Sequence, residues 1–274
     1  MLMLTKAGTL LIAVSLAACA SAADGMDVAL FPNAPERSAE DIMKAAHEAA
    51  GGHDWSRPET LSMDGYAVFY REGQATRHER HTMYRVYDAS KSEAHRADGK
   101  VRIESVRDGM SIINVAFDGS VTSTNDGPQP QSDADARWAS NFGFGVIRHA
   151  LDEGYSLTRL PDDLVDGKGA YWIRVTDPIG GETQFAIAYE DHAILSVAFD
   201  TERGWHQRIY SDFYSNPGVN WVQPRRVRLF YNGIKANEVI WTRHKIDVDL
   251  PDCLFSLPQR DECFGPFDSQ DTKP

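Results

Sequence analysis

Residues 205–246 read WHQRIYSDFYSNPGVNWVQPRRVRLFYNGIKANEVIWTRHKI. Apolar residues recur there at even spacing among charged and hydroxyl side chains, at Ile209, Phe213, Val227, Leu229, Tyr231, Ile240 and Ile246. Alternation of this kind predicts strands with one buried face and one wetter face. Two breaks, Asn216-Pro217-Gly218 and Asn232-Gly233, carry residue types that tolerate the positive φ of tight turns. We therefore expect three consecutive antiparallel strands.

The same alternation predicts eight further strands in the chain before this stretch. They are Leu61–Tyr70, Arg77–Tyr87, Val101–Val106, Met110–Phe117, Tyr155–Leu160, Ala170–Thr176, Thr183–Glu190 and Ala193–Asp200. Short turns, some with hairpin chemistry such as Asp108-Gly109, join most neighbours, which is typical of a β-meander. A sheet of about eleven strands is too long to stay flat, so we expect it to twist and curl strongly.

Two helices are expected beside the strands. Ser38 is a good N-cap with Asp41 three residues on, and Gly51-Gly52 ends the apolar periodicity that follows. A second helical segment is expected from about Ala134 to Glu153, after the polar loop Asn125–Asp133. The fold class is therefore mainly β (α+β). It is a single strongly curved antiparallel sheet or incomplete β-barrel of about eleven strands, with helices covering the concave face.

The N-terminus has the layout of a bacterial signal peptide over residues 1–19. Lys6 precedes an apolar run, Leu10–Ala18, which is shorter than the roughly 20 residues that span a bilayer. Leu16-Ala17-Ala18-Cys19 resembles the lipobox of bacterial lipoproteins, in which the cysteine is acylated. That resemblance implies lipid attachment at Cys19 and a lipoprotein on the periplasmic side of the cell envelope, with Ala20 favouring the outer membrane. Simple secretion after cleavage at Ala20-Ser21-Ala22 is the alternative.

Composition and cysteine count limit the partners. Net charge is −12, or −13 without residues 1–19, which carry one lysine and no acid; this argues against nucleic acid as a partner. Residues 20–37 hold two prolines and several small residues and are expected to form a flexible tether. If Cys19 carries lipid, Cys253 and Cys263 remain and are expected to form a disulfide that ties down the tail, residues 259–274. Two unpaired thiols are the alternative.

Catalytic and metal signatures are weak. His78 and His81 suggest a metal site, but residues three apart on a regular strand point to opposite faces, so we expect no metal there. The chain has no G-x-S-x-G elbow, no Walker-type glycine loop and no Asp-Thr-Gly or Asp-Ser-Gly sequence. We expect neither a cofactor nor an enzyme.

Adjacent apolar ladders predict a continuous hydrophobic face on the sheet. The candidates for lining a ligand cavity on it are Tyr171, Ile173, Val175, Phe185, Ile187, Tyr189, Leu195, Val197, Phe199, Val227, Leu229 and Tyr231. The alternative is that this face is only the core beneath the helices. The opposite parity carries Arg174, Arg208, Arg226 and Arg228, expected to pair with acids such as Asp212 on the solvent side. A site for a lipid head group or phosphate is the second interpretation of these arginines.

The layout resembles the lipoprotein-localisation-factor family (LolA/LolB-like envelope lipid-binding proteins). The residues that carry the resemblance are Tyr210-Ser211-Asp212-Phe213, Gly218, Pro224, Tyr231-Asn232-Gly233 and Leu254-Phe255-Ser256-Leu257-Pro258, within residues 38–258. The resemblance implies a half-barrel whose concave face holds acyl chains or another apolar ligand. The lipobox and the C-terminal cysteine pair differ from the family's periplasmic carrier, which puts a shuttling role in doubt.

The sequence therefore predicts a membrane-anchored envelope lipoprotein that binds a hydrophobic ligand: an acyl chain, a lipid or a lipid-modified protein. Two alternatives stay open. One is an envelope hydrolase with an unrecognised site, and the other is a structural lipoprotein whose interior is filled and holds no ligand.

Overall fold

The computed structural model describes residues 36–88, 99–131, 138, 143–258, 263 and 265–267. Contacts divide the chain into two units, Met1–Pro32 and Asn33–Pro274, and every element below belongs to the second unit. The predicted signal peptide, Cys19 and all of the tether except Glu36 and Arg37 lie outside the described residues. None of the helices in the described ranges is both long enough and apolar enough to cross a bilayer.

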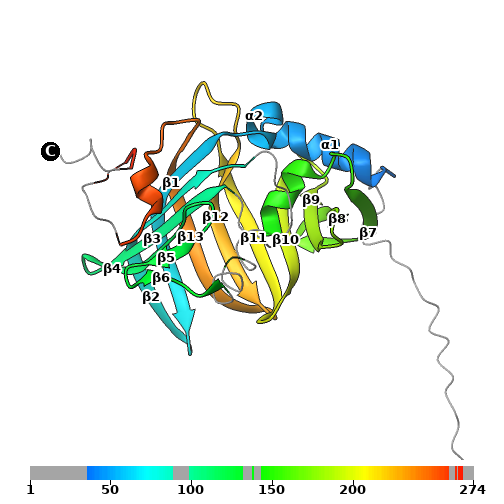
Figure 1. Ribbon diagram of the computed structural model, residues 1–274. Helices are drawn as coiled ribbons and strands as arrows, with labels where there is room; N and C mark the ends of the chain where they lie inside the picture. Colours follow the sequence, from blue (N-terminus) through cyan, green and yellow to red (C-terminus); the bar gives the residue numbers. More distant parts are fainter. Residues whose placement is uncertain are drawn as a thin grey trace, which may run out of the picture. The chain divides into compact units, whose positions relative to one another are not determined.

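One antiparallel sheet of thirteen strands makes up most of the described chain, in the order β6-β5-β4-β3-β2-β1-β13-β12-β11-β10-β9-β8-β7. Figure 1 shows these strands bending round as a curved sheet. Its outer strands, β6 and β7, do not pair with each other, so the sheet is not closed into a barrel. The strands are β1 (Thr60–Arg71), β2 (Gln74–Val86), β3 (Lys100–Arg107), β4 (Met110–Phe117), β5 (Thr122–Thr124), β6 (Gly127–Pro128), β7 (Ser156–Val165), β8 (Lys168–Thr176), β9 (Glu182–Ala188), β10 (Ile194–Thr201), β11 (Gly204–Tyr214), β12 (Gln223–Tyr231) and β13 (Ile234–Ile246).

The three strands expected in residues 205–246 are confirmed as β11, β12 and β13. Asn232 and Gly233 both have positive φ, 48° and 77°, as the two-residue turn between β12 and β13 requires. β13 also pairs with β1, with Leu61 opposite Ile246 and Phe69 opposite Asn237. This stretch therefore joins the strands from the two ends of the chain into one sheet.

The expectation of about eleven strands is wrong by the two short strands β5 and β6. β5 pairs with β4 and β6 pairs with β5, at the edge where the sequence predicts no strand and a polar loop beginning at Asn125. Thr122–Thr124 is entirely polar and Gly127–Pro128 is two residues long, so neither shows an apolar alternation. Pairing of β5 with β4 and of β6 with β5 stabilises them as strands, and sequence periodicity does not report such pairing.

The first helix forms as the sequence predicts. α1 (Ala39–Ala50) is capped by Ser38, whose Oγ accepts the amide N–H of Asp41 at 3.1 Å. Gly51 ends α1 with φ 134°, and α2 (Gly52–Ser56) follows at once. A Cβ on Gly51 would lie 2.2 Å from the carbonyl oxygen of Asn220, so only glycine fits this junction.

The second predicted helix is described only in part. Its described portion is a 3-10 helix, η1 (Gly143–His149), rather than an α-helix, and Gly143 and Gly145 disfavour the α conformation there. Of the preceding residues, the structure describes Trp138, whose indole Nε1–H donates to Thr122 Oγ1 at 2.7 Å. Buried residues of α1 and η1 belong to the same apolar cluster as residues of β8, β9 and β10: Ile42, Met43, Ala46, Val146, Ile147, Tyr171, Ile173, Phe185 and Val197.

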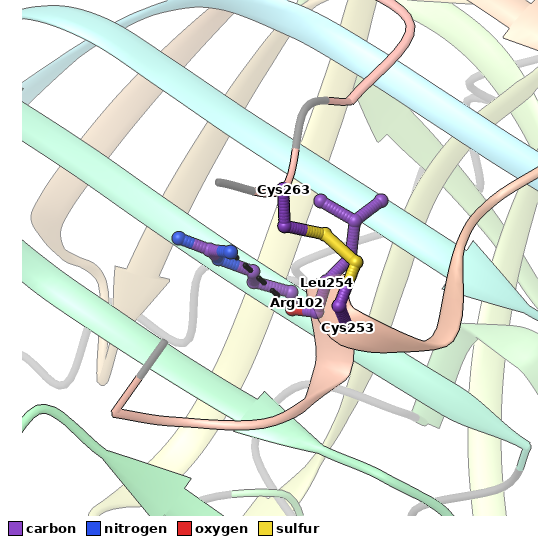
Figure 2. The surroundings of a disulfide bond; sticks show 4 residues. All are labelled: Arg102, Cys253, Leu254 and Cys263. Atoms are coloured by element: carbon purple, nitrogen blue, oxygen red, sulfur yellow. Dashed lines mark hydrogen bonds between the residues drawn. A yellow bond between two sulfur atoms is a disulfide. The ribbon is translucent and has the colours of Figure 1, made fainter. Parts of the chain in front are cut away.

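The disulfide expected between Cys253 and Cys263 is present (Figure 2). Cys253 lies in the 3-10 helix η2 (Asp252–Phe255), and Arg102 on β3 donates from Nη1 to the carbonyl oxygen of Leu254 at 3.3 Å. Leu254 and Phe267 pack with Tyr84 in a separate apolar cluster. The bridge therefore fastens the described part of the tail to the β2–β3 region of the sheet.

Candidate functional site

Residues of the sheet and of the helices line an open cavity of about 550 Å³. Side chains from β1, β2, β3, β4, β9, β10, β11, β12 and β13 line it together with residues of α1, α2 and η1. Most of these side chains are apolar: Ala49, Ala50, Trp55, Leu61, Met63, Phe69, Met83, Ile103, Ile113, Val115, Ile147, Phe185, Ala193, Ile194, Phe213, Trp221, Val222, Pro224, Val227, Leu229, Val239 and Trp241. A concavity of this size and character is typical of sites for small apolar ligands, which measure about 300–1,000 Å³.

Strand register places the middle of the lining in rows that cross the sheet. In one row Phe69 of β1 lies opposite Asn237, Asn237 opposite Leu229, and Leu229 opposite Arg208 of β11. Directly paired residues project from the same face of a sheet with Cβ atoms about 5 Å apart. The neighbouring row runs from Val239 through Val227 to Tyr210. The cavity floor is therefore mainly apolar. In the first row, Leu229 lies between two polar residues, Asn237 and Arg208.

The candidate lining residues occupy four different environments. Phe185, Val227 and Leu229 line the cavity. Seven others belong to, or pack against, the large apolar cluster shared with α1 and η1: Tyr171, Ile173, Val175, Ile187, Tyr189, Val197 and Phe199. Leu195 is in a different cluster with Ala186 and Ala188, because the register shifts between Ile194 and Ser196. The Tyr231 ring instead stacks under Arg203, 4.0 Å from its guanidinium carbon.

The four arginines assigned to one face of the sheet in fact occupy two environments. Arg226 pairs with Asp212 at 3.0 Å, as expected, and with Glu238 at 2.9 Å. Arg174 pairs with Glu182 at 3.4 Å, and Arg228 pairs with Asp166. Arg208 lines the cavity, so its placement on the solvent side is wrong. The error arises because β11 carries apolar side chains on both faces. Ile209 packs against the cluster that contains Leu195, whereas Tyr210 faces the cavity.

Burial raises the pKa of the Tyr210 phenol, and the positive charge of Arg208, together with a hydrogen bond to its side chain, opposes that rise. Tyr210 is therefore a neutral phenol at physiological pH. Its hydroxyl and the Arg208 guanidinium form a polar pair within the apolar lining. Such a pair offers hydrogen-bond donors to a polar group that enters the cavity.

The parity argument applied to His78 and His81 is wrong. On β2, His78 lies opposite Ala67 and His81 opposite Gly65, so two β2 residues face only Tyr66 in between. This β-bulge turns both imidazoles to one face. His81 packs on Trp241 with 5.3 Å between ring centroids, and burial lowers its pKa to about 4, with His78 adding to the effect.

His78 Nδ1 lies 2.7 Å from the Ser105 hydroxyl, and both side chains are buried. A serine beside an imidazole is the pairing that nucleophilic catalysis uses, but neither residue lines the cavity. The hydrogen bond satisfies two buried polar groups. Within the described ranges, no three His, Cys, Asp or Glu side chains converge as a metal site would need.

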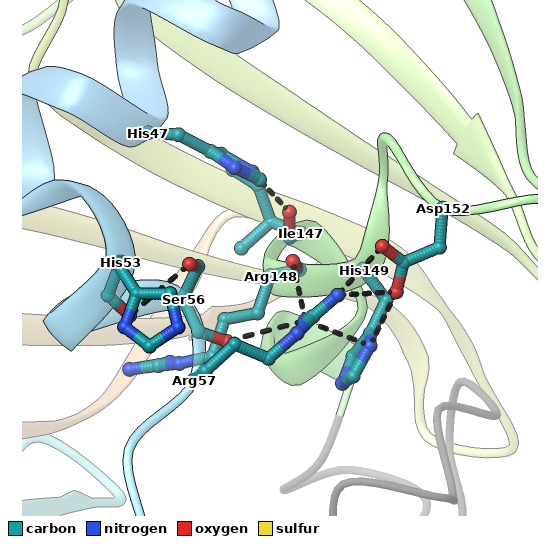
Figure 3. Close-up of polar contacts among 8 residues, drawn as sticks. All are labelled: His47, His53, Ser56, Arg57, Ile147, Arg148, His149 and Asp152. Carbon is teal, nitrogen blue, oxygen red and sulfur yellow. Dashed lines mark hydrogen bonds and ion pairs between the residues drawn. The ribbon is translucent and has the colours of Figure 1, made fainter.

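A polar network connects α1 and α2 to η1 beside the cavity (Figure 3). His47 Nε2 lies 2.6 Å from the Ile147 carbonyl oxygen; burial lowers the pKa of His47, so the neutral ring donates this hydrogen bond. Arg57 donates to the Arg148 carbonyl oxygen at 3.2 Å and binds the Asp152 carboxylate with Nη2 at 2.6 and 2.7 Å. The network therefore holds η1 against the N-terminal helices.

Arg148 lies on the cavity side of this network. Its Nε donates to the Trp55 carbonyl oxygen at 3.1 Å, and its guanidinium carbon lies 4.5 Å from the centroid of the Trp55 ring and 5.1 Å from that of Trp221. Contact with aromatic faces stabilises a desolvated guanidinium by about 2 kcal/mol or more. Arg148 is therefore an interior cation held by aromatic rings.

Similar solved structures include a LolA superfamily protein from Nitrosomonas europaea, 12% identical, covering 81% of this chain and 98% of that one with a TM-score of 0.49. A DUF1329 family protein from Desulfovibrio piger is also 12% identical, with the same coverage and a TM-score of 0.48. No protein-family model and no curated protein matches the chain. A LolA superfamily protein is thus among the similar structures.

Sequence reasoning missed the part of the lining that comes from the first half of the chain. Leu61, Met63, Phe69 and Met83 lie in stretches of visible alternation within β1 and β2. Their convergence with the rest of the lining depends on the pairing of β1 with β13, strands about 180 residues apart in the chain. No local signal in the sequence reports that pairing.

Proposed function

We propose that the protein is a cell-envelope lipoprotein that binds a hydrophobic ligand, either an acyl chain, a lipid or a lipid-modified protein, in the cavity of its open sheet. The observation that supports this best is a cavity of about 550 Å³ whose lining is mainly apolar. A structural protein with no ligand would gain stability by filling this volume, because unfilled core space costs packing energy. The retained cavity therefore favours a binding role.

The physical basis of binding is burial of the acyl chain. Each methylene removed from water contributes about 0.8 kcal/mol. A methylene is similar in size to a water molecule, which occupies about 30 Å³ of liquid, so the cavity has room for one long chain. One such chain supplies enough free energy for micromolar binding or tighter, even after the cost of immobilisation.

In this proposal the helices cover the concave face of the sheet and form the gate. Ala49, Ala50 and Trp55 from α1 and α2, and Ile147 and Arg148 from η1, contribute to the lining. Ligand entry would separate η1 from α1 and α2 and break the hydrogen bonds between them (Figure 3). Apolar ligand would then replace the contacts that are lost.

The membrane anchor is the second part of the proposal. Cleavage after residue 18 would leave Cys19 as the acylated N-terminal residue, and residues 20–37 would tether the binding domain, residues 38–258, to the outer membrane on its periplasmic side. The variant Cys19→Ser is expected to leave the protein unacylated and to shift it from the membrane to the periplasmic fraction. Globomycin, which blocks cleavage of lipoprotein signal peptides, is expected to leave residues 1–18 attached to a protein that stays in the membrane. A mature protein that begins beyond residue 19 and carries no acyl group would contradict the anchor.

Native mass spectrometry tests the binding function on protein purified from its own envelope in mild detergent. The expected result is a noncovalent adduct that dissociates on activation and is recovered by lipid extraction. Delipidated protein is then offered a fluorescent fatty acid. Absence of any adduct together with absence of probe binding would overturn the proposal in favour of a ligand-free structural lipoprotein.

A further inference from the structure

His81 is the one polar side chain that strands β1 to β4 contribute to the described lining of the cavity. The other lining side chains from these strands are apolar: Leu61, Met63, Phe69, Met83, Ile103, Ile113 and Val115. His81 is 8% exposed, and its Nδ1 has no hydrogen-bond partner among the described residues. Buried polar groups in folded proteins are nearly always hydrogen-bonded, because leaving one unpaired costs free energy. An unpaired imidazole nitrogen in the wall of a cavity therefore needs a physical reason.

The neighbouring strands place no hydrogen-bonding partner on this imidazole. On β1 the residue opposite His81 is Gly65, which has no side chain. A Cβ on Gly65 would lie 1.9 Å from a backbone carbonyl oxygen of β13, so only glycine fits there. Across this gap the His81 ring meets the Trp241 ring of β13, with 5.3 Å between their centroids. On β3 the opposite residue is Ser105, whose hydroxyl lies 2.7 Å from Nδ1 of His78 and is used there.

The His81 imidazole is uncharged at pH 7. Burial, together with the nearby His78, lowers its pKa to about 4. Asp191 is the one acid of the described lining, and its Oδ1 accepts the backbone N–H of Ala193 at 3.0 Å. A neutral imidazole carries one N–H donor and one acceptor nitrogen, so it offers an anion a single donor and no opposite charge. Its complement in a ligand is therefore an uncharged oxygen.

Apolar residues flank the imidazole along the sheet. Met83 lies two residues from His81 on β2, opposite Met63 of β1 and Ile103 of β3, and all three line the cavity. Directly paired residues project from the same face of a sheet, so these three side chains form an apolar row next to the imidazole. A molecule whose oxygen contacts His81 can therefore lay an aliphatic chain along this row.

We propose that His81 is the polar contact for the ligand, and that its imidazole hydrogen-bonds an uncharged oxygen, a hydroxyl or a carbonyl, carried by an otherwise apolar molecule. The inference rests on the proposed function and narrows the ligand class to neutral oxygenated lipids. The Cβ–Cγ torsion of histidine is roughly two-fold, so either edge of the ring can turn toward the cavity. Gln223, another polar residue of the lining, instead accepts from Trp221 Nε1 at 3.0 Å and donates to the Pro224 carbonyl oxygen at 3.2 Å.

A competition assay with delipidated protein tests this contact. Three ligands with the same C12 chain are compared for displacement of a neutral fluorescent lipid probe: dodecanol, 2-dodecanone and dodecane, which has no oxygen. Each dissociation constant is measured for the wild type and for His81→Phe, which keeps an aromatic ring beside Trp241 and removes both nitrogens. The variant is expected to weaken binding of dodecanol or 2-dodecanone about tenfold relative to dodecane, the usual effect of one lost hydrogen bond. A larger loss for dodecanol indicates a hydroxyl on the ligand, whereas a larger loss for the ketone indicates a carbonyl.

Met83→Leu is the matched control, because it changes the shape of the lining on the same strand and leaves its polar groups in place. It should change the affinities for the three ligands by the same factor. A second measurement needs no variant. Dodecanol or 2-dodecanone bound to the wild type should shift the imidazole ¹⁵N resonances of His81 more than dodecane does.

The outcomes separate the two proposals. If His81→Phe changes the affinities for all three ligands by the same factor, the His81 contact is overturned while the binding function stands. The contact is also overturned if the His81 resonances respond equally to the three ligands. Failure of all three ligands to displace the probe from the wild type, or of the probe to bind, would overturn the proposed function itself.

Discussion

Stability should fall as pH falls because His81 is buried in its neutral form. Its pKa in the folded protein is about 4, lowered from 6.5 by burial and by the neighbouring His78. Between these two values the unfolded chain binds a proton that the folded chain does not, so the free energy of unfolding decreases as the pH decreases. A shift of this size corresponds to a loss of about 3 kcal/mol once both pKa values are passed, and about 2 kcal/mol of it falls between pH 7 and pH 5.

The assay is urea unfolding followed by tryptophan fluorescence at pH 7 and pH 5, for the wild type and for His81→Gln. The variant removes the titrating group, so its loss of stability over this interval should be about 2 kcal/mol smaller than that of the wild type. His53→Gln is the matched control because that imidazole is exposed, and it should follow the wild type. Equal pH dependence in the wild type and His81→Gln would refute the assignment of His81 as a buried neutral base.

Three further perturbations test the junctions of the fold. Gly51→Ala puts a Cβ 2.2 Å from a backbone oxygen and should cost about 2 kcal/mol or more in chemical unfolding, whereas Gly145→Ala has open space and should cost less than about 0.5 kcal/mol. Replacing both Cys253 and Cys263 by serine should lower stability by about 2–3 kcal/mol, the entropy of a ten-residue loop, and an unchanged melting temperature would contradict this. Arg57→Gln should increase amide hydrogen exchange in α2 and η1 while costing at most about 1 kcal/mol, because the Asp152 ion pair is partly exposed; unchanged exchange would rule out a holding role.

Local patterns in the sequence correctly predicted those strands, turns and helix caps that depend only on neighbouring residues. The alternation in residues 205–246, the Asn232-Gly233 turn and the Ser38 cap depend on neighbouring residues, and all three form as expected. The Cys253–Cys263 bridge followed from counting cysteines and was likewise confirmed. Strands β5 and β6 lacked a signal because pairing, of β5 with β4 and of β6 with β5, stabilises them rather than composition.

The residues that line the cavity were harder to predict from the sequence than the fold was. Single-residue irregularities decide which face a side chain takes, and alternation cannot show them: the bulge on β2 turns His78 and His81 to one face, and the shift on β10 moves Leu195 away from the cavity. Arg208 was misplaced because both faces of β11 are apolar. A one-residue slip exchanges the two faces of a strand, so parity alone does not assign a cavity lining.

Equilibrium binding of a fluorescent fatty acid to two neighbouring variants on β12 tests whether the cavity is the ligand site. Leu229→Trp places a larger side chain inside the cavity, whereas Phe230→Trp makes a similar change at the next residue, on the opposite side of the strand. The account predicts that Leu229→Trp weakens binding about tenfold or more and that Phe230→Trp binds like the wild type. Equal affinity of all three proteins, or no binding by the wild type, would contradict it.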